Sequence, residues 1–219
     1  IETLMIKLHF QLIFIAAVSL GLAAENPNPV TLGGFQAVSL NSSMKIQYEI
    51  SEFELQQIDQ DGKSYVKLNM ENAGSMSDPG DPYLPTVSTY YAVEPGKSFS
   101  VVVNVQEKEI IPNVDILPFE SWDANLTGKL VKGDSYVRNS LYPETIATVS
   151  DPIVLRGLTM VQVSVTPFQY NPVTEELTVI QSVEVELVEN GVVEMPFIPA
   201  KRSRAFEPLY ESLVVNYAS

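Results

Sequence analysis

The sequence has 219 residues, no cysteine, and 27 acidic against 13 basic residues, which gives a formal net charge of −14. A hydrophobic content of 45% is typical of a folded globular protein, and the length fits one domain. The negative charge argues against binding to nucleic acid or anionic membranes, because basic residues must neutralise phosphates there. It favours simple solubility or a partner with a basic surface. The lack of cysteine excludes disulfides, thiolate nucleophiles and most structural zinc sites.

Residues 5–24 have the three parts of a secretory signal peptide. A charged start with Lys7 is followed by an apolar run from Phe10 to Leu22 and by small residues. The run is shorter than the ~20 apolar residues that cross a bilayer. We therefore expect a secreted protein that is cleaved between Ala24 and Glu25. An uncleaved anchor is the alternative.

The single histidine of the chain lies inside this expected signal peptide. Removal of the segment that contains His9 would leave a mature chain with neither His nor Cys. Ser–His–Asp triads, Cys–His dyads and His-based metal motifs are then excluded by residue type. We expect no metal, no cofactor and no catalytic activity of this chain.

Period-two alternation of polar and apolar residues dominates the rest of the sequence. Alternation indicates strands with one buried and one solvated face, and β-branched runs suit the same structure. Turn-forming clusters separate the runs. The fold class that this predicts is all-β, an antiparallel β-sandwich. The runs that carry the prediction are Lys45–Ile50, Glu52–Leu55, Val101–Val103, Val161–Val165 and Val183–Val188, and the turn clusters are 59–62, 78–82, 94–96 and 170–172.

Two segments depart from this alternation. The polar stretch from Ser121 to Asn139 predicts a long loop, with one short strand at most, and a loop of such length is usually functional or mobile. Near the end, Phe206, Leu209, Tyr210 and Leu213 recur at helical spacing, which predicts a short C-terminal helix with these four on one face.

Acidic clusters provide the only other candidate chemistry, and each has a simpler interpretation. Glu184 and Glu186 lie on the outer face of an alternating strand, so we expect solvated charges rather than an acid–base pair. The segment 59–62 resembles a calcium loop, but its glycine comes too early and the later glutamate is missing. A hairpin turn is the better prediction there.

Several segments, in the same order along most of the chain, together resemble the propeptide that precedes the catalytic domain of gingipain-like cysteine peptidases (peptidase family C25). The order and spacing carry this resemblance, since each piece alone is ordinary turn or strand chemistry. The segments are Gly80–Pro85, Gly133–Tyr136, Leu141–Pro143, Ile146–Pro152, Leu155–Gly157, Pro167–Pro172 and Phe206–Tyr217.

The resemblance implies a β-sandwich prodomain that docks on its own peptidase, keeps it latent and assists its folding. It also implies a loop that enters the active-site cleft, in which a basic side chain can fill the specificity pocket. By spacing the pocket residue would be Asn125 or Leu126, whereas Lys129 is the best basic candidate, so the specificity of the enzyme stays open. The loop comprises Trp122, Asp123, Ala124, Asn125, Leu126, Thr127, Gly128, Lys129, Leu130, Val131 and Lys132.

The resulting organisation is a signal peptide at 5–24, a β-sandwich prodomain at 25–200, and a basic linker with a helix at 201–219 that leads to a catalytic domain. Lys201, Arg202 and Arg204 form the expected processing site, because a basic-specific peptidase could cut an exposed linker there. The alternative is a secreted β-sandwich adhesion or carbohydrate-binding module without a peptidase partner.

Overall fold

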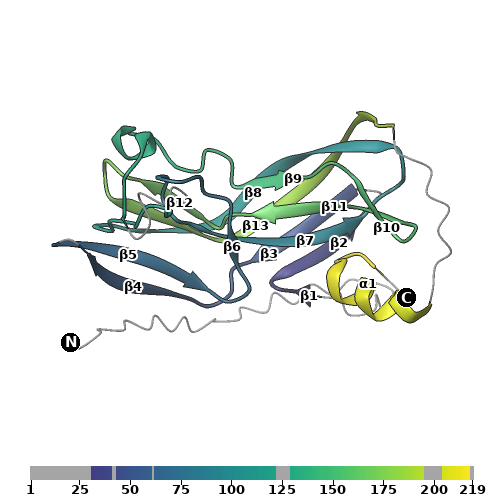
Figure 1. The fold of residues 1–219 in the computed structure, drawn as a ribbon. Coiled ribbons are helices and arrows are strands. Elements are labelled where there is room, and N and C mark those ends of the chain that lie inside the picture. Colours follow the sequence, from purple (N-terminus) through teal and green to yellow (C-terminus); the bar gives the residue numbers. More distant parts are fainter. Residues whose placement is uncertain (1–30, 41–42, 61, 122–128, 195–203, 218–219) are drawn as a thin grey trace, which may run out of the picture.

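The computed structural model describes residues 31–40, 43–60, 62–121, 129–194 and 204–217, which form two facing antiparallel sheets, a separate hairpin and a short C-terminal helix (Figure 1). This confirms the predicted fold class. The alternating runs become strands because each has one face against the core and the other toward water. Residues 183–188 of the longest strand illustrate this, since Val183, Val185 and Leu187 are buried while Glu184 and Glu186 face outward and pair with Lys45.

The first sheet is built around one long strand, β13, which pairs with β8 along one edge and with β3 and β12 along the other. Strand β2 continues the sheet from β3, and β1 pairs with β2. The strands are β1 (Thr31–Leu32), β2 (Phe35–Leu40), β3 (Ser43–Glu49), β8 (Lys97–Ile111), β12 (Phe168–Asn171) and β13 (Glu176–Val192).

The second sheet is centred on β11, which pairs with β7 on one edge and with β9 and β10 on the other. The short strand β6 pairs with β7. The strands are β6 (Gly74–Ser75), β7 (Pro85–Ala92), β9 (Ala147–Val149), β10 (Ile153–Leu155) and β11 (Leu158–Val165).

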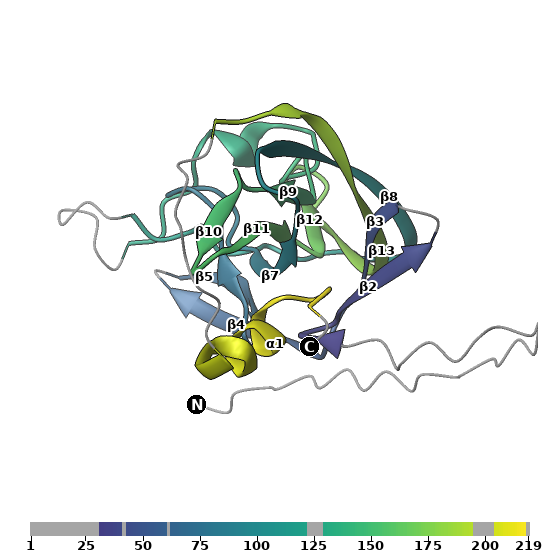
Figure 2. The same cartoon turned by 90° about the vertical axis from the view of Figure 1, so that its right-hand side faces the viewer.

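The inner faces of the two sheets form the main core. Figure 2 shows the ribbon with β3 and β13 of the first sheet on one side and β7 and β11 of the second on the other. Ile46 and Val185 from the first sheet, with Val161 and Val163 from the second, are completely buried. The removal of such aliphatic side chains from water contributes most of the favourable free energy that holds a sandwich of this kind together.

The hairpin of β4 (Phe53–Gln60) and β5 (Lys63–Met70) confirms the turn predicted at 59–62, since Gln60 pairs with Lys63. The hairpin covers a second hydrophobic cluster that includes Leu68, Ile116 and Tyr170. The segment around Ile116 runs beside β5, where the Val66 amide donates to the Asp115 carbonyl at 2.7 Å. Asp115 in turn pairs with Lys132, the last residue of the predicted loop.

The C-terminal helix α1 (Glu207–Leu213) forms as predicted, preceded by the 3-10 turn η2 (Arg204–Phe206). Leu209 and Leu213 are 40% and 36% exposed, whereas Tyr210 is completely buried. Of the apolar residues that the spacing places on one face, the helix therefore buries Tyr210 and leaves both leucines exposed to water. The chain continues past the helix along the second sheet, where Val214 and Tyr217 join Tyr210 in a hydrophobic cluster.

Among the described residues, no helix has the length and apolar character needed to cross a membrane.

Candidate functional site: the base of the 122–132 loop

The predicted loop is only partly described by the structure. Residues 122–128, from Trp122 to Gly128, lie outside the described residues, and so do Lys201, Arg202, Ala24 and Glu25. The described part is Lys129, Leu130, Val131 and Lys132, which belong to no helix or strand. The next residues form a 3-10 turn, η1 (Asp134–Val137), so the strand considered for this stretch is absent from 129–139.

Both described ends of the loop are bonded to one turn, at Gly80 and Asp81. The Gly80 amide donates to the Phe119 carbonyl at 3.0 Å, and the Phe119 amide donates to the Asp81 carbonyl at 2.7 Å. On the other side of the loop, the Gly133 amide donates to the Gly80 carbonyl at 2.8 Å. We call these three bonds the Gly80 clamp. They close the chain between Phe119 and Gly133 into a loop with a fixed base.

The Gly80 clamp depends on two glycines that approach each other closely. A Cβ added to Gly80 would lie 3.2 Å from the Gly133 nitrogen, and one added to Gly133 would lie 3.1 Å from the Gly80 oxygen. Gly80 also has a φ of +88°, a conformation that other residues adopt at a cost. Both glycines belong to turn motifs of the sequence, and the fold brings the two motifs together.

The clamp yields a stability prediction with an internal control. We expect Gly80→Ala to lower the free energy of unfolding by about 2–3 kcal/mol, because it adds a steric contact to a left-handed backbone. Gly62→Ala should cost only about 1 kcal/mol, because Gly62 has a similar φ of +75° with no atom within 4 Å of the added Cβ. Urea unfolding of both variants measures this. Equal losses would contradict a clamp that depends on close approach.

Lys132 is held by the body of the domain. Its Nζ lies 2.7 Å from both carboxylate oxygens of Asp115. The same ammonium lies over the rings of Tyr136 and Tyr65, at 4.8 and 5.5 Å from their centroids. The Lys132 ammonium thus already has a carboxylate as its ion-pair partner and two aromatic rings that stabilise its positive charge. The structure therefore gives Lys132 an anchoring role.

Tyr136 ties the turn after Lys132 into the second hydrophobic cluster. Its side chain is buried, and its hydroxyl donates to the Ile116 carbonyl at 2.7 Å. Burial, reinforced by nearby Tyr170 and Asp115, raises the pKa of the Tyr136 hydroxyl far above its ordinary value. On the opposite side of the clamp, the Phe119 ring stacks on Tyr83 with 5.8 Å between centroids. Aromatic contacts thus support both ends of the loop.

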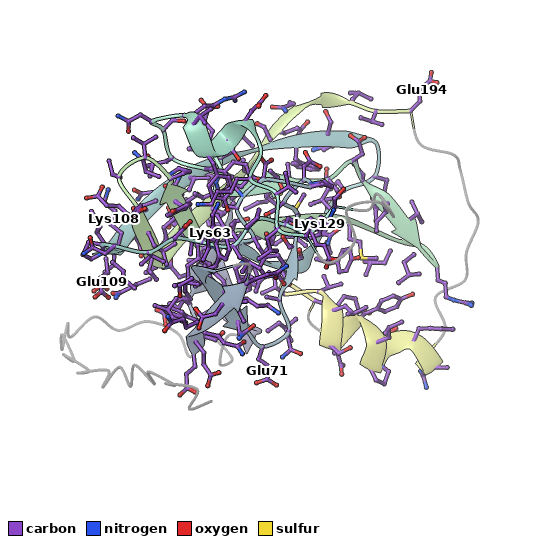
Figure 3. The ribbon with its side chains drawn as sticks, turned by 60° about the vertical axis from the view of Figure 1, so that its left-hand side comes forward. Lys63, Glu71, Lys108, Glu109, Lys129 and Glu194 are labelled. Atoms are coloured by element: carbon purple, nitrogen blue, oxygen red, sulfur yellow. The ribbon has the colours of Figure 1, made fainter. Side chains whose placement is uncertain are left out.

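Two other basic residues near the loop differ from Lys132. Lys129 and Arg138 are exposed, and no ion pair involves either of them within the described part of the chain. Lys129 is labelled in Figure 3, where other charged side chains such as Glu71 and Glu194 point outward from the ribbon. The sequence alone does not distinguish these basic residues. In the structure both Lys129 and Lys132 are exposed, but Lys132 is paired with Asp115, whereas no ion pair involves Lys129 among the described residues.

The described contacts at the loop base are hydrogen bonds, an ion pair and aromatic contacts. Across the described ranges, no group of three or more His, Cys, Asp or Glu residues could hold a metal ion. Sequence reasoning missed Asp115 and Tyr65, which contribute through long-range contacts. The turn motifs around Gly80 and Gly133 contained the only sequence signal for the clamp.

The fold is a two-sheet β-sandwich in which the Gly80 clamp closes the base of the 122–132 loop. Residues 23–218 match the family Propeptide_C25, and the chain belongs to this family of C25 peptidase propeptides. The chain is a prodomain and not the catalytic domain, in keeping with its lack of cysteine.

The chain is similar to gingipains of Porphyromonas gingivalis. The chain is 26% identical over 212 residues to gingipain R2 of Porphyromonas gingivalis, and 29% identical over 199 residues to gingipain R1. Each match covers 88% of this chain, but only 26% of gingipain R2 and 20% of gingipain R1. The chain therefore spans about a quarter or less of the length of these relatives.

Two solved structures share this fold. A complex of the pro- and mature domains of RgpB from P. gingivalis matches with a TM-score of 0.68 and 26% identity, over 84% of this chain and 98% of that chain. A structure concerned with the zymogenic latency of gingipain K from the same organism matches with a TM-score of 0.60 and 17% identity. This match covers 87% of this chain and 100% of that chain. At that identity the second match shows the shared fold alone.

Proposed function

We propose that this chain is the inhibitory and folding-assisting propeptide of a secreted gingipain-like cysteine endopeptidase, which it keeps latent until proteolytic removal. The observation that carries the proposal is the match over nearly the whole prodomain seen in the RgpB pro- and mature-domain complex. The partner is then a peptidase catalytic domain that supplies the Cys and His this prodomain lacks. The signal-peptide pattern at 5–24 supports export.

The Gly80 clamp supports a role of the 122–132 loop in this inhibition. A loop whose ends are fixed loses less conformational freedom when it binds, so more of its contact energy appears as affinity. Lys129 lies on the loop side of the clamp and is exposed, so its side chain remains available to a partner. We propose Lys129 as the basic side chain of the loop that meets the peptidase, with Asn125 and Leu126 as alternatives by spacing.

Covalent linkage would make this inhibition efficient before processing. A prodomain joined to its enzyme acts at a high effective concentration, so modest contacts give almost complete occupancy. Cleavage at the basic processing site, Lys201, Arg202 or Arg204, would remove that advantage. Arg204 is described by the structure and is exposed, which suits a processing site.

The proposal is tested by titrating purified residues 25–219 against the mature gingipain-like peptidase encoded by the same genome. We expect stoichiometric loss of peptidase activity. A domain that is folded by circular dichroism, yet leaves activity unchanged at roughly micromolar concentration, far above the nanomolar range of tight inhibitors, would contradict the proposal. The adhesion or carbohydrate-binding module would then be favoured.

A further inference from the structure

The C-terminal tail, Arg204–Tyr217, is packed against the outer face of the second sheet. Tyr210, Val214 and Tyr217 form a hydrophobic cluster with Leu158 and Met160 of β11. Tyr210 is 0% and Val214 is 1% exposed. Figures 1 and 2 both show α1 lying beside this sheet. The tail is therefore an integral part of the sandwich.

The backbone of the tail is bonded to the edge of β7. The Val215 amide donates to the Tyr90 carbonyl at 2.8 Å. The side chain of Asn216 bonds both backbone groups of Ala92, accepting from its amide at 2.7 Å and donating to its carbonyl at 2.9 Å. These bonds fix the tail by direction and register, as strand addition to a sheet edge does in peptide recognition.

The first contact of the tail is made by Phe206 with the β10–β11 turn. The guanidinium carbon of Arg156 lies 4.0 Å from the centroid of the Phe206 ring. Arg156 has a φ of +49° in a two-residue turn where Asn or Gly is usual. The favourable cation–π contact with Phe206 offsets part of the free-energy cost of this backbone conformation. The turn thus forms one wall of the groove that holds the tail.

All of these contacts lie on the C-terminal side of the Arg204–Ala205 peptide bond. Arg204 and Ala205 are exposed, and Phe206 is the first partly buried residue. A cut after Arg204 would separate the tail from the sandwich in sequence while removing none of these contacts. We propose that the groove of β7, β11 and the Arg156 turn retains the tail after such a cut, so that this prodomain survives processing as a two-piece complex.

Retention of the tail would also affect release of the enzyme, a consequence that rests on the proposed function. A peptidase domain that followed the tail would still carry it after the cut at Arg204. The prodomain would then stay attached to its enzyme through the groove, in addition to any contact of the 122–132 loop. Release would require the tail to leave the groove or a second cut beyond Tyr217.

Limited trypsin digestion of residues 25–219 tests the retention without any peptidase partner. After size-exclusion chromatography under native conditions, mass spectrometry should find the peptide 205–219 in the same fraction as the sandwich. Loss of this peptide from a sandwich that is still folded by circular dichroism would overturn the inference. Inhibition of the peptidase is measured in a separate assay, so a failure of the proposed function would not change the outcome of this digestion.

Variants of the tail identify the groove. We expect Asn216→Ala and Tyr210→Ala to lower the retained fraction at least tenfold, because they remove the Ala92 bonds and a buried ring. Leu209→Ala is the matched control on the exposed side of the same helix and should retain the tail as the unaltered protein does. Arg156→Ala removes only the contact with the Phe206 ring and should weaken retention about threefold. Equal retention by all four variants would also overturn the inference.

Discussion

Between pH 10 and pH 11, the free energy of unfolding is expected to fall by about 3 kcal/mol through three buried tyrosines alone. Burial raises the pKa of Tyr48, Tyr136 and Tyr170 well above the ordinary value of 10. The unfolded chain loses these protons near pH 10, whereas the folded chain keeps them. The stabilisation is therefore complete below pH 10 and is lost as the pH rises further. Urea unfolding at pH 8, 10 and 11 measures it.

Tyr48→Phe and Tyr136→Phe separate the ionisation effect from the loss of a hydrogen bond. The Tyr48 hydroxyl has no hydrogen-bond partner within the described part of the chain, so its removal should cost little at pH 8. Removal of the Tyr136 hydroxyl should cost about 1–2 kcal/mol at pH 8, because the Ile116 carbonyl loses its donor. Each variant should lose about a third of the alkaline decrease. A flat stability between pH 9 and pH 11 would contradict the prediction.

The fold class could be predicted from the sequence because it depends on local patterns. Alternation in Val183–Val188 and the turn at 59–62 depend on neighbouring residues, and both predictions are confirmed. The C-terminal helix was also predicted, whereas its spacing does not indicate which of its apolar residues are buried. Periodicity compares positions only within the helix, whereas the buried side is decided by Val214 and Tyr217, which follow it along the sheet.

The loop base could not be predicted because its contacts join distant parts of the chain. Nothing near Lys132 in the sequence indicates that its charge is paired with Asp115. Similarly, Gly80 and Gly133 are ordinary turn residues until the fold brings them together. The pocket residue remains a prediction, since Asn125 and Leu126 lie outside the described residues.

Replacing 123–128 by a Gly/Ser segment of equal length is expected to weaken inhibition of the peptidase at least about 100-fold, because the loop would keep its closure but lose its contact side chains. Lys129→Ala alone should weaken inhibition at least about 30-fold if its ammonium occupies an acidic pocket, since truncating one partner of a buried charge pair costs 2–5 kcal/mol. The inhibition constant of each variant, measured against the cognate peptidase, tests both expectations.

Lys132→Ala and Arg138→Ala are the controls for Lys129→Ala, because they test whether another basic residue near the loop fills the specificity pocket of the peptidase. Lys132 already binds Asp115, so its loss should reduce the free energy of unfolding by about 1 kcal/mol while inhibition weakens only a few-fold. Arg138 is exposed beyond the clamp, and its replacement should change neither quantity. A larger loss of inhibition at Lys132 than at Lys129 would mean that the Asp115 pair opens on binding. Unchanged inhibition after the Gly/Ser replacement would remove the loop from the mechanism and leave inhibition to the sandwich surface, because the Gly80 clamp would still hold the same base.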